Sequence, residues 1–323
     1  MPAPAPSLHS ATDITVLMAV YNGAAHLGAQ LDSIEAQTHT DWRLIASDDG
    51  SSDDSRAVLE QTADRWAAAH GPVLEIIDGP QRGAAENFMS LLRHLGAQAR
   101  TPGWIAFCDQ DDIWIEDKLA RAQAAVQGHP AEVPAFYCAR TWIMDPQMDK
   151  RRLSAPRPRP PGFRNALVQN IASGNTILLN PAASALVLEA ATRVGGVVVH
   201  DWWVYQLITG AGGIVVHDDT PALLYRQHAG NEIGANDTWR ARIKRIRQLL
   251  QGDFRDWNRI NVAALNTTAE MLSVQNREIL SGFGSLPARG VLARLVLLQR
   301  LRLYRQSFAS TAALWLAAVL GKL

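Results

Sequence analysis

The stretch Ile14–Val20 has the sequence ITVLMAV, an unbroken apolar run near the start of the chain. A run of this kind is typical of a β-strand that is covered on both faces, as in the parallel sheet of an α/β protein. The next segment, Ala24–Gln37, places Leu27, Leu31 and Ile34 at helical spacing. The two segments therefore predict the first strand and the first helix of an α/β fold.

The same alternation of strand-like and helix-like segments continues along the chain. Strands are expected at Trp42–Ser47, Val73–Ile77 and Trp104–Cys108, and helices at Ser55–His70 and Glu86–Leu95. A β-α-β-α order favours a mostly parallel sheet with helices on both faces.

The pattern loosens after these units. Further strands are expected at Val133–Ala139, Thr176–Leu179 and Gly213–Val216. The stretch Arg151–Arg164 is expected to be a loop, because its prolines cannot continue a helix or a central strand.

The charges of the chain cancel in the sum but not along the sequence. The chain has 31 Lys+Arg and 31 Asp+Glu and is 47% hydrophobic, which excludes a strongly basic nucleic-acid binder and an acidic disordered chain. Residues 236–323 hold 14 Lys/Arg and five Asp/Glu, a net charge of +9, so residues 1–235 carry −9. This asymmetry predicts two parts with different partners: an α/β domain over 13–235 and a basic helical region over 236–323.

The basic region is expected to form three helices, at Trp239–Gln251, Trp257–Ser281 and Val291–Leu320. The first separates basic from apolar side chains. Such a helix can lie on an anionic lipid surface, or it can pack on the α/β domain with its basic face in solvent; the sequence leaves both open. The longest apolar run, Thr311–Gly321, is about half of the roughly 20 residues that a membrane-spanning helix needs.

Compartment and targeting signals are sparse. The two cysteines favour a reducing compartment, and residues 1–12 are a Pro/Ala-rich segment, expected to be disordered, without the order of a secretory signal. We therefore expect a cytoplasmic protein, with peripheral attachment to the inner face of the membrane as the alternative that the basic helices leave open.

Acidic side chains follow the predicted strands at three places. They are Asp48 and Asp49 after the second strand, Asp109, Asp111 and Asp112 after the fourth, and His200-Asp201 after Val197–Val199. Ligands of open α/β sheets bind beyond the carboxyl ends of the strands, where carboxylates can hold Mg²⁺ or Mn²⁺. Turn formation explains Asp48-Asp49-Gly50-Ser51 equally well. For Asp109, Asp111 and Asp112 we favour function, because three carboxylates in four residues repel one another unless a cation or solvent relieves them.

Several of these segments, taken in order, resemble motifs of family 2 glycosyltransferases. They are Val16–Gly23 (VLMAVYNG), Gln30–Ile34 with Gln37-Thr38, Ser47–Asp53 (SDDGSSD), and Phe107–Trp114 (FCDQDDIW) with Lys118-Leu119. The form Asp-Gln-Asp-Asp-Ile-Trp, together with His200–Trp203 (HDWW) and Tyr225–His228 (YRQH) followed by Asn231 and Gly234, resembles the rhamnosyltransferase-like branch. The resemblance covers the order of motifs over most of residues 13–235.

The resemblance implies a GT-A fold, in which a nucleotide-binding α/β half joins an acceptor-binding half. It implies an inverting, metal-dependent glycosyltransferase that uses a nucleotide-diphospho sugar, with dTDP-L-rhamnose as the expected donor. The expected acceptor is a growing cell-surface polysaccharide or a lipid-linked glycan, and the expected cofactor is Mn²⁺ or Mg²⁺.

The resemblance also implies roles for single residues. Donor-binding positions are Ala19, Tyr21, Asn22, Asp48, Asp109, Gln110, Arg226 and His228. Tyr21 would stack on the base, Asp48 would meet the base edge and Asp109 would lie near the ribose. Asp111 would bind the metal, while Asp112 is open to a second interpretation as the N-cap of a helix expected at Ile113–Gln127.

On the acceptor side, the resemblance makes Asp201 the general base that takes a proton from the acceptor hydroxyl. The alternative is a purely structural role, in which Asp201 is an N-cap for the helix that follows. His200 would orient Asp201 or simply pack. Gly174, Asn175 and Trp202 are weaker candidates for the acceptor or sugar pocket, and Gly174 is as well explained by an ordinary turn.

The sequence is also compared with two alternative functions. A nucleotidyltransferase shares the sheet type and the acidic metal site, but it needs a basic, Gly-rich loop after the first strand, and Tyr21–His26 contains no Lys or Arg. A catalytically silent protein that binds sugar nucleotides at the membrane is the other alternative, and the full set of acidic positions counts against it.

Overall fold

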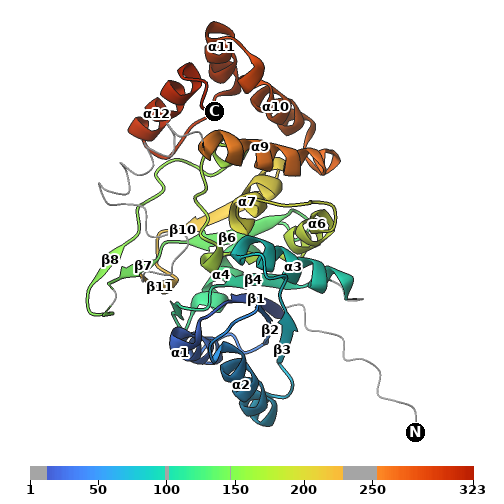
Figure 1. The fold of residues 1–323 in the computed structure, drawn as a ribbon, viewed down its shortest axis with the longest axis vertical. Coiled ribbons are helices and arrows are strands. Elements are labelled where there is room, and N and C mark those ends of the chain that lie inside the picture. The colour runs from blue at the N-terminus through green and yellow to red at the C-terminus, as the bar shows by residue number, and fades with distance from the viewer. Residues whose placement is uncertain (1–12, 99–101, 146, 228–252) are drawn as a thin grey trace.

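The structure is a computed structural model, and it describes residues 13–98, 102–145, 147–227 and 253–323. Its main sheet has seven strands in the order β10-β6-β9-β4-β1-β2-β3 (Figure 1). The strands are β1 Ile14–Val20, β2 Trp42–Asp48, β3 Leu74–Asp78, β4 Trp104–Cys108, β6 Ala135–Ala139, β9 Leu178–Leu179 and β10 Ile214–Asp218. All are parallel except β9, which pairs antiparallel with β4 and β6. The predicted, mostly parallel α/β sheet is confirmed.

Helices cover both faces of this sheet, as a doubly covered parallel sheet requires. They are α1 Ala24–Glu35, α2 Ser55–His70, α3 Ala84–Ala97, α4 Lys118–Gln127, α6 Pro181–Ala191 and α7 His200–Gly210. The alternation of β1 shows the two sides: Val16 and Met18 belong to the same buried cluster as Leu27 of α1, whereas Leu17 belongs to the cluster that contains Leu92 of α3. Successive side chains of a strand point to opposite faces, so an all-apolar strand is the pattern that two covered faces demand.

A second, smaller sheet lies beyond the carboxyl end of β4. It has the order β5-β11-β7-β8, made by β5 Ile113–Trp114, β11 Leu223–Arg226, β7 Trp142–Met144 and β8 Arg151–Leu153. Because β4 ends at Cys108 and β5 begins at Ile113, the acidic residues 109–112 connect the two sheets. Residues 109–112 therefore lie between the two sheets, where a ligand can contact both sheets.

Three local predictions were wrong. Ile113 and Trp114 form a strand, so α4 begins only at Lys118, with Asp117 at its N-cap position, and Asp112 is not an N-cap. The stretch expected to be all loop begins with β8, because its prolines start only at Pro156 and leave the earlier N–H groups free to pair with β7. The strand expected from Thr176 starts at Leu178, since Gly174–Thr176 form a 3-10 turn, η1.

The C-terminal region is helical but more divided than its sequence suggests. Its helices are α9 Asp253–Asn266, α10 Val274–Gly284, α11 Val291–Leu301 and α12 Phe308–Val319, with short 3-10 turns η2 Ala269–Met271 and η3 Leu286–Ala288. The helix expected over Val291–Leu320 breaks because Arg302 adopts a left-handed conformation (φ 50°) and Ser307 starts α12 with a capping box. The basic helix expected at Trp239–Gln251 lies outside the described residues.

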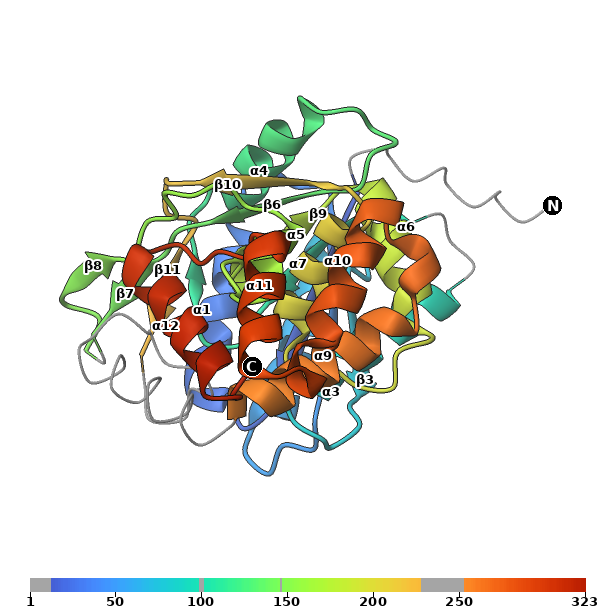
Figure 2. The same cartoon turned by 90° about the horizontal axis from the view of Figure 1, so that it is seen from above.

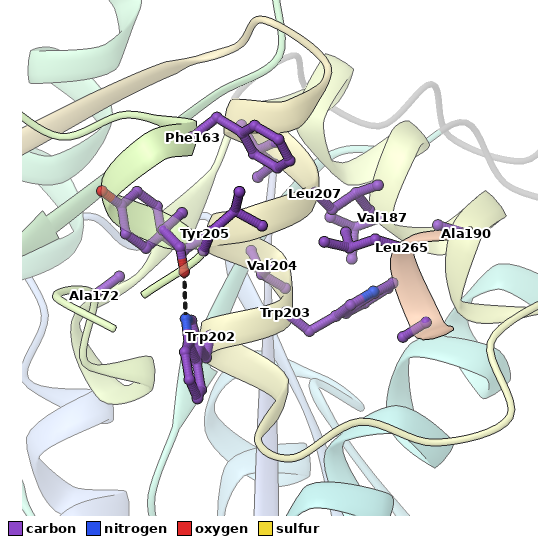
Figure 3. Close-up of a cluster of buried hydrophobic side chains, with 14 of the residues drawn as sticks. Phe163, Ala172, Val187, Ala190, Trp202, Trp203, Val204, Tyr205, Leu207 and Leu265 are labelled. Carbon is purple, nitrogen blue, oxygen red and sulfur yellow. Dashed lines mark hydrogen bonds between the residues drawn. The ribbon is translucent and has the colours of Figure 1, made fainter. Parts of the chain in front are cut away.

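These helices pack on the α/β part rather than standing apart (Figures 1 and 2). Leu265 of α9 and Leu298 of α11 belong to the same buried cluster as Leu207 of α7, and Figure 3 shows Leu265 beside the inward side chains of α7. The loop before α12 is also tied down, because Asn165 Nδ2 donates to the Tyr304 carbonyl at 3.0 Å. None of the helices described in the structure is long and apolar enough to cross a membrane.

Candidate active site

The loops that follow β1 and β2 are hydrogen-bonded to each other. The Asn22 N–H donates to Ser51 Oγ at 2.9 Å, and Asn22 Oδ1 accepts from the Ser52 N–H at 2.8 Å. Asn22 holds a left-handed φ of 48° to make this turn, a conformation that Asn tolerates better than most residues. Next to it, the Tyr21 side chain is 57% exposed. Asn22 is thus used to shape the loop, while the ring of Tyr21 stands open for stacking.

Asp48 and Ala19 lie on neighbouring strands near the carboxyl edge of the sheet, one residue apart in register. The register of β1 and β2 pairs Ala19 with Ser47 and Val20 with Asp48. Asp48 is only 8% exposed, and its Oδ1 accepts from the Ser51 N–H at 3.0 Å. The structure therefore brings two predicted donor positions to one edge, next to the loop that carries Tyr21.

The neighbouring Asp49 has a different task. Its carboxylate accepts three consecutive main-chain N–H groups, from Gln81 at 2.6 Å, Arg82 at 3.1 Å and Gly83 at 2.8 Å. These residues lead directly into α3, so Asp49 fixes the β3–α3 connection against β2. This fits the turn-stabilising interpretation of Asp49.

Gln110, expected among the donor-binding residues, contacts the main chain of Tyr21. Its Oε1 accepts from the Tyr21 N–H at 2.8 Å, and its Nε2 donates to the Tyr21 carbonyl at 3.0 Å. A side chain on Gly23 would meet Gln110 Oε1 at 2.3 Å, so only glycine leaves room for this pair. In this structure the Gln110 amide joins the acidic loop to the Tyr21 loop.

The acidic loop brings three carboxylates together. Asp112 is fully buried, and its Oδ2 accepts from Asn175 Nδ2 at 2.5 Å. Burial raises the pKa of Asp112 well above its usual range, and the charges of Asp109 and Asp111 raise it further. Arg226, at the end of β11, donates from Nε to the Asp111 carbonyl at 3.2 Å. The second predicted cationic donor, His228, lies outside the described residues.

The donor set of this loop fits a divalent cation in part. Carboxylate oxygens are the ligands that Mg²⁺ and Mn²⁺ prefer, and a cation would relieve the repulsion that raises the Asp112 pKa. Among the residues that the structure describes, no three His, Cys, Asp or Glu side chains are arranged to hold a metal by themselves. A cation here would need further oxygen ligands, such as diphosphate and water, which is the usual mode of Mg²⁺.

Lys118 is a functional candidate to which the sequence assigned no role. It is 1% exposed, and its Nζ lies 3.2 Å from the centroid of the Trp114 ring. Burial lowers its pKa to about 7, although the neighbouring acidic groups of Asp112 and Cys108 act in the opposite direction. The only signal in the sequence is its position in the Phe107–Leu119 motif. A lysine at the start of a helix has no other feature that would indicate a function.

Asp201 lies in the first turn of α7, and its carboxylate is closely held. Oδ1 accepts from Asn170 Nδ2 at 3.0 Å and from the Trp202 N–H at 2.6 Å, and Oδ2 accepts from the Gly174 N–H at 3.0 Å. Burial raises the pKa of Asp201 to about 6, although these hydrogen bonds work in the opposite direction. A carboxylate with a raised pKa is a stronger base than an ordinary one and is still ionised at neutral pH.

Asn170 is the residue that the sequence did not reveal. Its Oδ1 accepts from the Ala172 N–H at 3.1 Å, which turns its Nδ2 toward Asp201. Asn170 therefore orients the Asp201 carboxylate. Nothing in its local sequence distinguishes it from a loop asparagine, and only its closeness to Ser173-Gly174-Asn175 hints at a role.

His200 packs instead of orienting Asp201. Its ring stacks on Phe88 with centroids 3.8 Å apart and meets Phe107 edge-on at 5.0 Å. Burial lowers its pKa to about 3, so it is neutral. A side chain on Gly174 would meet His200 Nε2 at 2.7 Å, which explains the glycine by close packing.

The turn η1 joins the Asp201 region to the acidic loop. Of two consecutive residues, Gly174 donates its N–H to Asp201 and Asn175 donates its amide to Asp112. Asn175 is 1% exposed, so it acts from inside the protein. Trp202 is also internal: it is 5% exposed, and its Nε1 donates to the Ala166 carbonyl at 2.6 Å (Figure 3). The structure thus brings Gly174 and Asn175 to the site and places the Trp202 ring in the core.

Comparisons with known proteins agree with this arrangement. The family model described as "Glycosyl transferase family 2" matches residues 15–178. The dTDP-rhamnosyl transferase RfbG of Shigella flexneri is 24% identical over 241 residues, 71% of this chain and 78% of that protein. A UDP-Glc:alpha-D-GlcNAc-diphosphoundecaprenol beta-1,3-glucosyltransferase of Escherichia coli, WfgD, is 32% identical over 107 residues, 33% of this chain and 38% of that protein.

Among solved structures, S. aureus TarS 1–349 is similar in fold. The TM-score is 0.52 at 14% identity, over 84% of this chain and 70% of that one. The match supports the α/β architecture with its helical C-terminal region. The family model ends before Asp201 and Arg226, so for these two positions the local geometry carries the argument.

Proposed function

The chain belongs to glycosyl transferase family 2, and from that premise we propose that it is an inverting, metal-dependent enzyme that moves a sugar from a nucleotide-diphospho donor to a glycan hydroxyl. Glycosyl transfer itself follows from the family. The observation that carries the finer proposal is Asp201, a buried carboxylate with a pKa raised to about 6. It is joined through Gly174 and Asn175 to the acidic loop at the carboxyl edge of the sheet.

On the donor side, the exposed ring of Tyr21 stacks on the base, and Asp48 with Ala19 lines the edge where the base and ribose lie. Asp109 faces the ribose and Asp111 holds the cation. When bound, Mn²⁺ or Mg²⁺ neutralises charge on the diphosphate. Arg226, already at the acidic loop, donates to the leaving diphosphate, and His228 is proposed to do the same.

On the acceptor side, Asp201 takes the proton from the attacking hydroxyl. The acceptor oxygen forms its bond to the anomeric carbon on the face opposite the diphosphate, and the bond from that carbon to the diphosphate oxygen breaks with its electron pair. Inversion at the anomeric carbon follows from this single displacement. Asn170 and the Gly174 N–H keep the carboxylate aimed during the step.

The proposed donor is dTDP-L-rhamnose, and the proposed acceptor is a growing cell-surface polysaccharide or a lipid-linked glycan. The name of the Shigella relative supports the donor, and the diphosphoundecaprenol in the name of the Escherichia relative supports a lipid-linked acceptor. We assign donor binding and catalysis to residues 13–235. Residues 236–323 are assigned to an anionic membrane surface, which makes the protein cytoplasmic and peripheral on the inner face.

A donor panel tests the proposal. The full chain is incubated with dTDP-rhamnose, UDP-glucose, UDP-N-acetylglucosamine and GDP-mannose, each with Mn²⁺, Mg²⁺ or a chelator, and the released nucleotide is identified. We expect dTDP from dTDP-rhamnose only when a metal is present. Pyrophosphate released in a parallel incubation with dTTP and L-rhamnose 1-phosphate would show a nucleotidyltransferase, and binding without release from any donor would show a silent sugar-nucleotide protein.

Removal of the metal gives a second readout. A thermal-shift assay should show stabilisation by the donor with Mn²⁺ and little stabilisation after chelation, because a ligand at about 100 times its Kd adds about 2.7 kcal/mol. Equal stabilisation with and without metal would contradict metal dependence and leave transfer itself intact.

A further inference from the structure

One end of the molecule carries a concentration of exposed apolar side chains. Of the ten large apolar side chains that are exposed in the described residues, seven lie between Val291 and Leu320. Scattered exposed apolar residues are ordinary on a soluble protein, but a contiguous patch marks a contact surface. Figure 1 shows α11 and α12 together at the end of the molecule opposite α1 and α2.

Helix α12 is the centre of this patch. Its sequence, FASTAALWLAAV, contains no ionisable side chain. Phe308 is 90% exposed, Leu316 54%, Val319 42% and the adjoining Leu320 48%. These positions are separated by eight, three and one residues, a spacing that puts them on one side of a helix. The outward side of α12 is therefore apolar where a solvent-facing helix would be polar.

Helix α11 packs against α12 and also carries exposed apolar side chains. Leu292 is 81% exposed and Val296 is 51% exposed, one turn apart. We define the α11–α12 apolar face as Leu292, Val296, Phe308, Leu316, Val319 and Leu320. The segment 160–164 holds the end of α11 and the loop after it in place. Arg164 donates to the Leu301 carbonyl, and Tyr304 Oη donates to the Pro160 carbonyl at 2.6 Å. The face is thus a fixed feature of the fold.

The segment that carries this face has charges of one sign only. From Ile279 to Leu323 the chain has six basic residues and no Asp or Glu: Arg289, Arg294, Arg300, Arg302, Arg305 and Lys322. Arg294 is used internally, since its guanidinium donates to the carbonyls of Leu286 and Ala318. Arg300 and Arg302 are exposed at the end of α11. An apolar face with a cationic rim matches an anionic bilayer, whereas a second copy would oppose it with the same positive charges.

We propose that the α11–α12 apolar face docks on an anionic lipid bilayer, with Phe308 and the leucines in the headgroup boundary and the arginines on the phosphates. This deepens the proposed function and rests on it for its purpose, because a lipid-linked acceptor is met at that surface. The proposal places the lipid contact on α11 and α12, so it does not depend on the basic segment 239–251.

Vesicle sedimentation of the full chain without substrates tests the proposal. The vesicles are phosphatidylcholine with about 30 mol% phosphatidylglycerol, or phosphatidylcholine alone. The first variant is Phe308→Gln/Leu316→Gln/Leu320→Gln, which changes only exposed side chains. Its matched control is Ile260→Gln/Val274→Gln, which removes exposed apolar side chains from α9 and α10. The charge variant is Arg300→Gln/Arg302→Gln, with Arg255→Gln/Arg277→Gln as its control.

We expect the wild type to bind anionic vesicles more tightly than neutral ones and to lose binding as salt rises. The apolar triple variant should bind at least about tenfold more weakly, since its lost burial in lipid is worth that much or more, and both controls should stay within about twofold of the wild type. Circular dichroism and the midpoint of thermal unfolding confirm that the variant is folded.

Three results would overturn the proposal. The first is that the wild type fails to bind vesicles, and the second is that the triple variant binds as well as the wild type. The third is that the wild type self-associates in sedimentation equilibrium, the triple variant does not, and neither binds lipid. Because no donor or acceptor is present, each result is independent of whether the proposed reaction is correct.

Discussion

Asp53 and Asp201 each accept three hydrogen bonds, and burial sets the two carboxylates apart. Asp53, in the exposed loop before α2, accepts from the Ala24 N–H, the Ser55 N–H and Ser55 Oγ. Desolvation alone would raise the pKa of Asp53, but these hydrogen bonds outweigh it and lower the pKa. Asp201 accepts from Asn170, Gly174 and Trp202, yet burial raises its pKa to about 6. Equal hydrogen bonding therefore gives opposite shifts when the cost of desolvation differs.

The difference in pKa separates a structural carboxylate, Asp53, from a proposed catalytic one, Asp201. Asp53 lies at the first residues of α1 and α2, where a negative charge stabilises both helix N-termini. This structural role needs the negative charge of Asp53 and does not need a raised proton affinity. Asp201 is held just as firmly, but its proton affinity is raised toward the range that proton transfer at neutral pH needs. The comparison predicts that loss of charge at Asp201 damages turnover and that the same change at Asp53 damages stability.

The largest expected effect comes from Asp201→Asn. The amide keeps the size of the side chain but cannot take a proton, so kcat should fall by about 10²- to 10⁴-fold. Donor binding should stay within about twofold, because Asp201 acts on the acceptor. Steady-state kinetics and isothermal titration with the donor measure the two quantities, with Asp53→Asn as the matched control. A variant that keeps full activity would remove Asp201 from the mechanism.

The next effect is on the pH profile. Asp201 must be ionised to act as a base, and its pKa is about 6, so kcat/KM should be flat above neutral pH and bend downward near pH 6. Well below that pH, the rate should fall about tenfold for each pH unit. The Asp53→Asn enzyme should keep this acidic limb. If the limb instead lies near pH 4, the environment of Asp201 does not tune the reaction.

Gln110→Glu should have a smaller effect. A glutamate cannot donate to the Tyr21 carbonyl as Gln110 Nε2 does, and it adds a fourth negative charge beside Asp109, Asp111 and Asp112. Loss of one such link costs about 1 kcal/mol, so KM for the donor should rise about five- to tenfold, with kcat less affected. Gln275→Glu, an exposed position on α10, is the control. An unchanged donor KM would show that the Gln110–Tyr21 pair has no part in donor binding.

The first part of the fold could be read from the sequence because its signals are local. An apolar run such as Ile14–Val20 reports its own burial, and α2 has the predicted bounds. Other features depend on contacts between distant residues. The Tyr21–Gln110 pair spans 89 positions and the Asp112–Asn175 pair spans 63. No periodicity in the sequence records such contacts, so neither of these hydrogen bonds could be predicted.

The same reasoning applies to Asn170 and Lys118. Their roles come from what packs around them, not from their neighbours in sequence. The N–H of Ala172 holds the Asn170 amide toward Asp201, and Lys118 is distinguished by its burial against the ring of Trp114. The residue types at the site were thus predictable where a strand end carries them, and unpredictable where a loop folds back onto the site.

The smallest expected effect tests the scaffold side of the comparison. Asp53→Asn removes a charge from two helix N-termini, each worth about 0.3–1 kcal/mol, so the free energy of unfolding should fall by about 1 kcal/mol. Because the pKa of Asp53 is lowered on folding, its contribution is complete above the unfolded pKa near 3.8 and disappears as pH falls through the lower folded value. The stabilities of the wild type and variant, measured by denaturant unfolding, should therefore differ at pH 7 and converge toward pH 3. A difference that persists at low pH would mean that the side chain acts through shape instead of charge, and the contrast with Asp201 would lose its electrostatic basis.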